Sequence, residues 1–584
     1  MALKFSQFPA AVLCGLFLSA CDGPKDGTYT FELLTTNDMH GCYFDSTYVG
    51  SRIKPSLYAV KRIVDSVRTA AGAEHVLLVD AGDVLQGDNA AYYYDYVDTL
   101  SPHIFPRMAA FMGYDAVTVG NHDIEAGHPV YDRVRKELEA CGIPFLAGNA
   151  IRTGDGKPYF RAFRLIEREG IRILVLGYTN PNIPNWLSER LWSGMTFESL
   201  LPRVQEDVDR LRRAYRPHLV VVSVHSGTGK GDGTLLENQA LDLLDSLHGV
   251  DFLVGGHDHR ALTMDRDSLC LINAGSHCRY VGHGTVRLTV RGGNVTERSL
   301  DAGLIPVSRW KVDTLMAAEF LPEYAAVKRF TTTPVGQLRT ELRTREAYSG
   351  MSDYLALLHT VSLSCKPARL SIAAPLTYDG TVQPGTLLYN DLFTIYPFEN
   401  QLCVVQMTGA EVARYLEISY DDWIRTFPNP EGHLLKIEAA DNPHAGWKGW
   451  AFVNRPYNFD SVGGLVYSVD ITKPFGARIR IASLADGQPF DTAATYPVAM
   501  TSYRANGGGG LLDRAGVDTD RIESRIVATC PEFRDLLYAY LQEHGAIDAD
   551  EIRNPARIGH WSFVPESVAG PALRKDLELL FGRN

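Results

Sequence analysis

The chain has 584 residues, more than one hydrophobic core usually supports, so we expect two domains. Its 45% hydrophobic and 22% charged residues are typical of a globular protein. The formal net charge of −12 is spread along the chain, which argues against a nucleic-acid polymer as the main partner, because polyanion binding needs a basic face. A small phosphorylated partner is still allowed, since bound metal ions can reverse the local field.

The first twenty residues have the pattern of an export signal. Lys4 precedes an apolar stretch from Phe8 to Ala20, which is too short to span a bilayer as a helix. The stretch ends in Leu-Ser-Ala followed by Cys21, which resembles the bacterial lipobox, where cleavage leaves the cysteine as the lipidated N-terminus. An ordinary signal peptide with a chance cysteine is the alternative. We expect a lipoprotein signal peptide at residues 1–20 and a periplasmic or cell-surface protein, anchored to a membrane through Cys21.

The cysteines that follow Cys21 have no C-x-x-C spacing, so they do not form a zinc-finger or redox pattern. Cys270 and Cys278 could form a disulfide in an oxidising compartment. Small buried thiols are an equally good interpretation of this pair.

The first half of the chain repeats a short β-branched run, a polar turn and a helical stretch. Runs of this length, rich in valine, isoleucine and leucine, suit strands that helices bury on both faces. The expected strands are Phe31–Thr35, Val76–Val79, Ala116–Val119, Ile171–Leu176, Leu219–Val224 and Val250–Val254. Amphipathic stretches at Val130–Ala140 and Leu200–Tyr215 predict helices. The repeat indicates a layered α/β domain.

The pattern changes near Trp310–Arg329, a predicted helix that is followed by three threonines and Pro334. We place a domain boundary there, because the second half has fewer parallel-strand signals and predicts a separate α+β domain. Its expected strands are Leu402–Thr408, Gly464–Ile471, Arg478–Leu484 and Tyr496–Thr501, and its expected helices are Gly409–Tyr420 and Glu532–His544.

Polar residues follow the strands of the first half. In an open α/β sheet, ligands bind beyond the carboxyl ends of the strands, so polar side chains at several such ends converge. The residues at five strand ends are Asp38 with His40, Asp83, Asn121, His225, and His257 with His259. Each alone would more often be a turn or core residue, but five ends in order outweigh that interpretation. Imidazole, carboxylate and amide ligands without thiolate suit Zn, Mn or Fe rather than Ca.

These blocks, in this order, resemble the motifs of the calcineurin-like metallophosphoesterases: D-x-H, G-D, G-N-H-[ED], H and G-H-x-H. The resemblance implies two divalent metal ions. One ion would be held by Asp38, His40, Asp83 and His259, and the other by Asp83, Asn121, His225 and His257. In the family, a hydroxide between the two ions attacks phosphorus while the cations neutralise charge on the phosphoryl oxygens.

His122 follows Asn121 and is not a metal ligand in the family, where this histidine stabilises the transition state or protonates the leaving oxygen. Related nucleotidases orient it with an acid three positions later, which is Glu125 here, while Asp123 directly follows it. The sequence leaves open which carboxylate is the partner, so both join His122 in the expected catalytic group. His277 and His283, after the last block, are candidates for a supporting role.

Two segments of the second half resemble the C-terminal substrate domain of the 5'-nucleotidase family. They are Pro397-Phe398-Glu399-Asn400 and Tyr503-Arg504-Ala505-Asn506, the latter followed by four glycines. In that family two aromatic rings clamp the nucleobase, which implies that Phe398 and Tyr503 are the clamp and that Asn400 hydrogen-bonds the base. A ring that packs in a core and a glycine turn would be the simpler explanation of each segment alone.

The second half also departs from the 5'-nucleotidase pattern. The family's N-G-G-G-[IV]-R segment, whose Asn and Arg help bind the nucleotide, is replaced by the uncharged residues 373–378, and its G-G-D by glycines 507–509. Both changes, together with Tyr457-Asn458-Phe459-Asp460, are more similar to the periplasmic 2',3'-cyclic-nucleotide 2'-phosphodiesterase/3'-nucleotidases.

The resemblance implies an α/β protein built from a four-layer metallophosphatase β-sandwich with flanking helices and an α+β substrate-binding domain. We expect the first at residues 28–308, a linker helix at 309–333, the nucleotide-binding domain at 334–562 and a C-terminal tail at 563–584.

The implied function is an exported nucleotide phosphohydrolase of the 2',3'-cyclic-nucleotide 2'-phosphodiesterase/3'-nucleotidase type, which releases nucleoside and phosphate from a small nucleotide. A 5'-nucleotidase or UDP-sugar hydrolase is the alternative within the same class. Two further alternatives are a phosphatase for esters that lack a base and a surface protein that binds nucleosides without turnover. Oligomeric state and metal identity are left open by the sequence.

Overall fold

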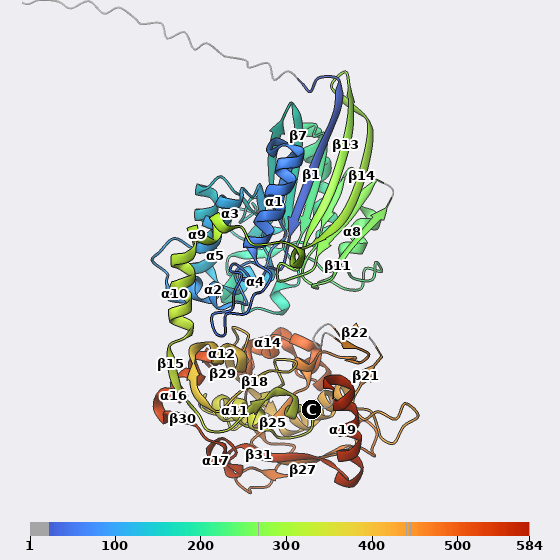
Figure 1. Ribbon diagram of the computed structural model, residues 1–584. Coiled ribbons are helices and arrows are strands. Elements are labelled where there is room, and N and C mark those ends of the chain that lie inside the picture. The colour runs from blue at the N-terminus through green and yellow to red at the C-terminus, as the bar shows by residue number, and fades with distance from the viewer. Residues whose placement is uncertain (1–22, 267, 440, 443–446, 583–584) are drawn as a thin grey trace, which may run out of the picture.

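The structure, a computed structural model, describes residues 23–266, 268–439, 441–442 and 447–582. The expected signal peptide at 1–20 and the anchor residue Cys21 lie outside this part of the chain. Two domains are joined by helices α9 (Thr314–Glu319) and α10 (Leu321–Thr331), as Figure 1 shows. Within the described ranges, no helix combines the length and the apolarity needed to cross a membrane.

The N-terminal domain contains two six-stranded sheets. In the first, the order is β14-β13-β1-β2-β3-β4, with β1 to β4 parallel and β13 antiparallel to both of its neighbours, β1 and β14. In the second, the order is β11-β12-β10-β9-β7-β6. The strands of the first sheet are β1 (Gly27–Thr36), β2 (Val76–Asp80), β3 (Ala116–Thr118), β4 (Phe145–Leu146), β13 (Tyr280–Arg291) and β14 (Asn294–Pro306). Those of the second are β6 (Phe163–Arg168), β7 (Ile171–Tyr178), β9 (Leu219–Val224), β10 (Phe252–Val254), β11 (Ala261–Arg266) and β12 (Leu269–Ala274).

The two sheets pack face to face, and helices cover both outer faces. Successive strand residues point to opposite faces, so Leu33 of β1 packs between the sheets while Leu34 packs under helices. In the second sheet, Ile173 lies between the sheets and Leu174 lies under helices. The covering helices are α1 (Leu57–Ala71), α3 (Ile104–Met112) and α5 (His128–Ala140) on the first sheet, and α7 (Leu200–Tyr215) and α8 (Ala240–Ser246) on the second. The expected four-layer architecture is confirmed.

Two features of this domain differ from the sequence prediction. The long hairpin of β13 and β14 was missed, because β14 is only partly buried and carries no continuous apolar run. The expected single linker helix is two helices that meet at Phe320. Pro322 has no N–H to donate to the carbonyl of Ala318, which favours the break observed at this point.

The C-terminal domain has one large core around a five-stranded sheet with the order β25-β17-β28-β20-β29. Its strands are β17 (Leu370–Ala373), β20 (Gln401–Thr408), β25 (Ser461–Gly463), β28 (Thr495–Thr501) and β29 (Ile526–Glu532), with β26 (Leu465–Asp470), β27 (Ile479–Leu484) and β31 (Gly559–Val564) in a second sheet. The main helices are α11 (Asp353–Ser362), α13 (Gly409–Trp423) and α16 (Phe533–His544).

The expected C-terminal tail at 563–584 is instead part of this domain. It contains helix α19 (Glu566–Phe581), whose Ala569, Leu573 and Leu580 belong to the same buried core. The burial of this apolar face, which favours a packed helix over a free segment, requires the rest of the domain as a partner.

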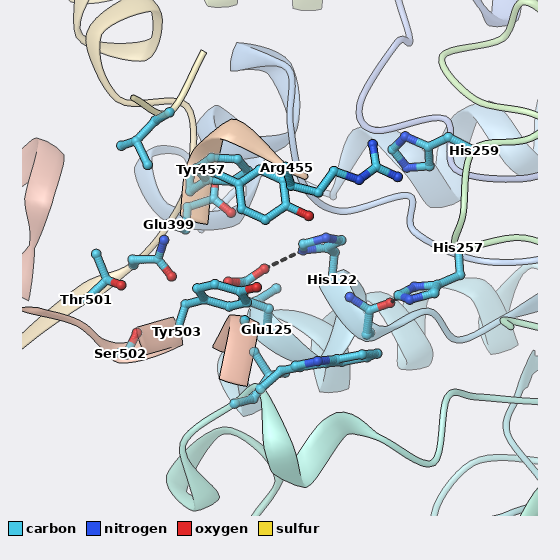
Figure 2. A pocket seen from close by; sticks show the side chains of 18 of the residues that line it. His122, Glu125, His257, His259, Glu399, Arg455, Tyr457, Thr501, Ser502 and Tyr503 are labelled. Carbon is cyan, nitrogen blue, oxygen red and sulfur yellow. Dashed lines mark hydrogen bonds and ion pairs between the residues drawn. The ribbon is translucent and has the colours of Figure 1, made fainter. Parts of the chain in front are cut away.

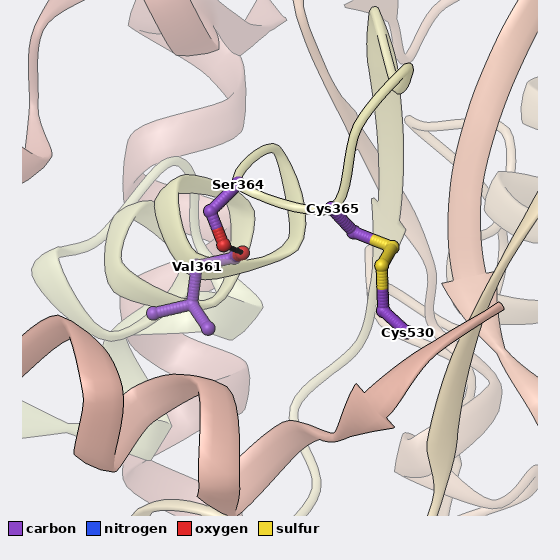
Figure 3. Close-up of a disulfide and its surroundings, with 4 residues drawn as sticks. All are labelled: Val361, Ser364, Cys365 and Cys530. Atoms are coloured by element: carbon purple, nitrogen blue, oxygen red, sulfur yellow. Dashed lines mark hydrogen bonds between the residues drawn. A yellow bond between two sulfur atoms is a disulfide. The ribbon is translucent and has the colours of Figure 1, made fainter. Parts of the chain in front are cut away.

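A disulfide joins Cys365, just after α11, to Cys530 on β29, with 6.0 Å between the two Cα atoms (Figure 3). It ties α11 to the strand that leads into α16. Cys270 and Cys278, considered as a pair from the sequence, are both buried free thiols, so that pair does not form.

The two domains contact each other beside the linker. Helix α2 (Asn89–Tyr92) of the N-terminal domain faces α12 (Tyr389–Ile395) of the C-terminal domain. Hydrogen bonds across this boundary are Asn89 to Asn390 (2.8 Å), Tyr92 to Tyr389 (3.3 Å between hydroxyls) and Asn506 to the Trp186 carbonyl (3.4 Å). These contacts place loops of both domains around one cavity.

Candidate metal centre and substrate cavity

The structure brings the seven predicted ligands together at the carboxyl ends of the central strands. Asp38 and His40 follow β1, Asp83 follows β2, and Asn121 follows β3. His225 follows β9 directly, and His257 and His259 follow β10. All but His257 and His259 are buried.

The seven side chains form two neighbouring groups. In the first, the candidate ligand atoms of Asp38, His40 and His259 all lie within 4.8 Å of one another, and the Nε2 atoms of His40 and His259 are 2.9 Å apart. In the second, His225 Nε2 lies 3.1 Å from an Asp83 oxygen. Asn121 Oδ1 is 3.0 Å from His225 Nε2 and 2.9 Å from His257 Nδ1. The groups adjoin where Asp38 Oδ1 lies 4.0 Å from His225 Nε2.

Neighbouring groups fix which ring nitrogen of each histidine faces the cluster. The Nδ1 of His40 faces the Gln86 carbonyl at 3.2 Å, and that of His225 faces the Ala81 carbonyl at 2.8 Å. A carbonyl accepts only from N–H, so the lone pair of each ring is at Nε2 and points inward. This convergence of imidazole, carboxylate and amide acceptors fits a pair of divalent cations of the Zn, Mn or Fe type.

The backbone around the cluster is strained in a consistent way. Among the described residues, ten non-glycine positions have a positive φ, and five of them are candidate ligands: Asp38, His40, Asp83, His257 and His259. The left-handed region costs free energy for such residues, and it persists where the surrounding structure imposes it. Gly120 is required by close approach, because a Cβ there would lie 2.1 Å from Asp83 Oδ1.

One cavity of about 1650 Å³ connects this cluster with the C-terminal domain. His122, His257 and His259 line it from the N-terminal side, and Tyr457 and Tyr503 line it from the C-terminal side, as Figure 2 shows. Trp186 stacks on the His257 ring with a centroid distance of 5.1 Å, so an aromatic wall continues towards the candidate ligands.

Comparison with known proteins agrees with this geometry. The calcineurin-like phosphoesterase family model matches residues 31–261, and the model of the 5'-nucleotidase C-terminal domain matches residues 329–514. The chain belongs to the 5'-nucleotidase family of calcineurin-like phosphoesterases. It is therefore a phosphoric ester hydrolase, and its phosphoesterase domain implies divalent metal ions.

Individual relatives are distant but extend over most of this phosphoesterase. The 2',3'-cyclic-nucleotide 2'-phosphodiesterase/3'-nucleotidase of Haemophilus influenzae is 24% identical, over 91% of this chain and 87% of its own length. The trifunctional nucleotide phosphoesterase of Bacillus subtilis is 22% identical over 94% of this chain, which spans 40% of the length of that relative. A Staphylococcus aureus structure, provisionally assigned as a 5'-nucleotidase, has a TM-score of 0.74 at 19% identity and covers 91% of this chain and 99% of its own.

His122 of the phosphoesterase pairs with Glu125. Its Nδ1 contacts a Glu125 carboxylate oxygen, which leaves Nε2 for the cavity. Burial lowers the pKa of His122, but the nearby carboxylates of Asp83 and Glu125 outweigh it and raise that pKa to about 10. Cations bound at Asp83 would reduce its contribution, while that of Glu125 would remain.

Asp123 has a different place from the one expected for a partner of His122. Its side chain is fully buried and accepts backbone N–H groups of Asp83, Val84, Leu85 and Gly120 at 2.7 to 3.0 Å. The carboxylate therefore fixes the loops that carry Asp83 and Asn121, and it makes no contact with the His122 ring. Glu125 alone has the geometry of the orienting acid.

Three neighbouring aromatic rings, rather than the predicted two, line the cavity on the side of the C-terminal domain. Tyr457 lies between Phe398 and Tyr503, with centroid distances of 6.5 and 6.3 Å. Tyr457 is 36% exposed, whereas Phe398 packs partly against the core. The sequence analysis noted Tyr457 as a subfamily feature but did not assign it a role. Asn400 lines the cavity, yet it is buried and its amide faces the Tyr396 hydroxyl at 3.4 Å.

Two buried arginines hold the segments that carry these rings. Arg504 pairs with Asp460 at 2.8 Å and donates to the Tyr457 carbonyl at 3.2 Å. Arg534 donates to the Phe398 carbonyl at 3.0 Å and to Glu399 at 3.1 Å. An unpaired buried charge costs free energy, so each arginine keeps these partners. The contacts therefore hold the wall of the cavity in place.

The two histidines considered for a supporting role are separated by the fold. His277 lines the cavity, and its ring centroid lies 5.3 Å from that of His40. Burial lowers the pKa of His277 to about 4, so the ring is neutral at pH 7. His283 is on β13 and pairs with Glu32 at 2.9 Å, and it does not line the cavity.

Proposed function

We propose that this phosphoesterase is an exported nucleotide phosphohydrolase of the 2',3'-cyclic-nucleotide 2'-phosphodiesterase/3'-nucleotidase type. The observation that supports it most is one cavity, which is lined by the candidate ligands Asn121, His257 and His259 at one end and by the tyrosine pair Tyr457 and Tyr503 at the other. A nucleotide has the same two ends, a phosphate and a planar base. The proposed products are a nucleoside and inorganic phosphate.

Different residues along the cavity would have different roles. The first metal ion would be held by Asp38, His40 and His259, and the second by Asp83, Asn121, His225 and His257, with Asp83 shared between them. When bound, such a pair supplies an activated water and neutralises charge on the phosphoryl group.

The proton for the leaving oxygen would come from Nε2 of His122, which Glu125 orients through the opposite ring nitrogen. At the far end, Tyr457 and Tyr503 would contact the base through their faces, with Phe398 behind them and Asn400 at the edge. Attraction between a planar base and an aromatic face depends little on which base is bound, so we expect tolerance among bases.

A 5'-nucleotidase is the second candidate, because the matched C-terminal domain model carries that name. The absence of the N-G-G-G-[IV]-R segment at residues 373–378, which line the cavity without a cation, places it second. A nucleoside-binding protein without turnover is disfavoured, since the candidate ligands are all present and converge.

The proposed location outside the cytoplasm rests on the export signal at residues 1–20 and on Cys21 as the lipid-bearing residue. Cell fractionation with and without Cys21→Ser tests it. We expect the unmodified protein in the membrane fraction and the variant released in soluble form. Equal distribution of the two proteins would contradict the anchor.

One substrate panel tests the activity. Metal-loaded protein is assayed with 3'-AMP, 2',3'-cyclic AMP, 5'-AMP and UDP-glucose, beside Asp83→Ala and the surface control Asp245→Ala. We expect turnover of the first two substrates, loss with Asp83→Ala and no change with the control. Preference for 5'-AMP would reverse the order of the two candidates. Equal rates in Asp83→Ala would refute the proposed metal centre.

A further inference from the structure

A cationic side chain of the C-terminal domain reaches the metal end of the cavity. Arg455 lines the cavity, and Figure 2 shows its side chain pointing from beside Tyr457 towards the ring of His259. Glu237 lines the same cavity, and its carboxylate lies 3.9 Å from Nε2 of His257. The guanidinium therefore points towards one candidate ligand and shares the cavity with a carboxylate that lies beside another, although its backbone belongs to the other domain.

Arg455 stands on a turn whose geometry is fixed. Its carbonyl accepts the N–H of Asn458 at 2.9 Å, and Arg504 donates to the Asn458 side chain and to the Tyr457 carbonyl, each at 3.2 Å. Arg455 and Tyr457 are two residues apart on this turn. The backbone positions that carry the aromatic ring and the cation are consequently held at a set spacing.

Arg504, the other cationic residue of the C-terminal domain that lines the cavity, already has partners within the protein. Arg504 is 3% exposed, and it is paired with Asp460 and with backbone carbonyls. Residues 373–378, which line the same cavity, are uncharged. Arg455 is exposed, and its side chain makes no hydrogen bond or ion pair within the described residues.

We propose that Arg455 binds the substrate's phosphoryl group and is the residue by which the C-terminal domain recognises phosphate. This deepens the proposed function and rests on it for the identity of the base-bearing substrate. A guanidinium matches two phosphoryl oxygens at once, and its charge favours a dianionic monoester over a monoanionic diester. Because Arg455 and Tyr457 share one turn, base and phosphate would be positioned together.

The test separates phosphate recognition from base recognition. Dissociation constants of inorganic phosphate and of adenosine are measured by calorimetry on the metal-loaded full chain and on Arg455→Gln, Arg455→Lys and Tyr457→Ala. Arg480→Gln, an exposed arginine on β27 outside the cavity, is the control. Loss of one charge-assisted contact is expected to weaken phosphate about 10- to 100-fold in Arg455→Gln, with adenosine unchanged. Arg455→Lys should retain part of the affinity, and Tyr457→Ala should weaken adenosine instead.

Kinetics provide the second readout. With p-nitrophenyl phosphate, which has no base, kcat/KM of Arg455→Gln should fall by a factor similar to that seen with the nucleotide. Phosphate affinity within twofold of the unmodified protein would overturn the proposal, as would a loss confined to adenosine. If the protein hydrolyses p-nitrophenyl phosphate but none of the nucleotides, the proposed function fails while the phosphate titration still decides the role of Arg455.

Discussion

The pairing of His122 with Glu125 can be tested by Glu125→Gln, which keeps the size of the side chain and removes its charge. Glutamine can still accept from Nδ1, so the ring keeps one neutral hydrogen bond. A hydrogen bond to a charged group contributes about 1 kcal/mol more than a neutral one. We therefore expect kcat to fall about fivefold, with a smaller change in KM.

The pH profile should change in a defined direction. The carboxylate of Glu125 raises the pKa of His122, so imidazolium persists to higher pH. A protonated donor is lost as pH rises through that pKa. Removing the Glu125 charge lowers the pKa, so the alkaline limb of kcat should move to lower pH, by about 0.7 pH unit for 1 kcal/mol.

The assay is the pH dependence of kcat and kcat/KM for 3'-AMP, or for p-nitrophenyl phosphate if no nucleotide is turned over. The exposed helical residue Glu139, changed to glutamine, serves as a control that should leave both profiles unaltered. An unchanged alkaline limb together with kcat within a factor of 1.5 of the unmodified protein would refute Glu125 as the partner of His122.

Three further predictions follow from the site. Asp123→Asn replaces one of two accepting oxygens by an amide group that faces backbone N–H groups. We expect the free energy of unfolding to fall by about 3 kcal/mol or more, seen as a lower thermal-unfolding midpoint and weaker metal binding. An unaltered midpoint would contradict this. Tyr457→Ala should raise KM for nucleotides about 5- to 100-fold but leave KM for p-nitrophenyl phosphate unchanged. Phe398→Ala should raise KM for nucleotides less. A larger increase with Phe398→Ala than with Tyr457→Ala would make Phe398 the principal ring. Chelation should abolish turnover and lower the unfolding midpoint, because metal at 100 times its dissociation constant stabilises the folded state by about 2.7 kcal/mol; full activity after verified metal removal would exclude a metal-dependent reaction.

The candidate ligands at the carboxyl ends of the strands could be predicted from the sequence alone. Val76–Val79 is a continuous apolar run, and Leu219–Val224 is interrupted only by Ser223, so the burial of both strands follows from composition. The residues that follow each run then lie at a known edge of its sheet. Local pattern was therefore sufficient to predict that Asp83 and His225 meet, although 142 positions separate them in the sequence.

Contacts without a periodic signal were decided only by the tertiary structure. Asp123 and Glu125 both follow His122 closely, and only the helix α4 (Asn121–Glu125) and the buried loop at Asp83 assign one to the ring and the other to backbone N–H groups. The pairing of Cys365 with Cys530 spans 165 residues, and no spacing rule encodes it.

The ends of strands can thus be predicted from the sequence, because burial imposes a regular pattern of apolar residues on each strand. Side-chain partners cannot, because they depend on where separate segments meet. The metal centre belongs to the first kind. The position of Arg455 belongs to the second, since this residue of the C-terminal domain lines a cavity that the N-terminal domain completes.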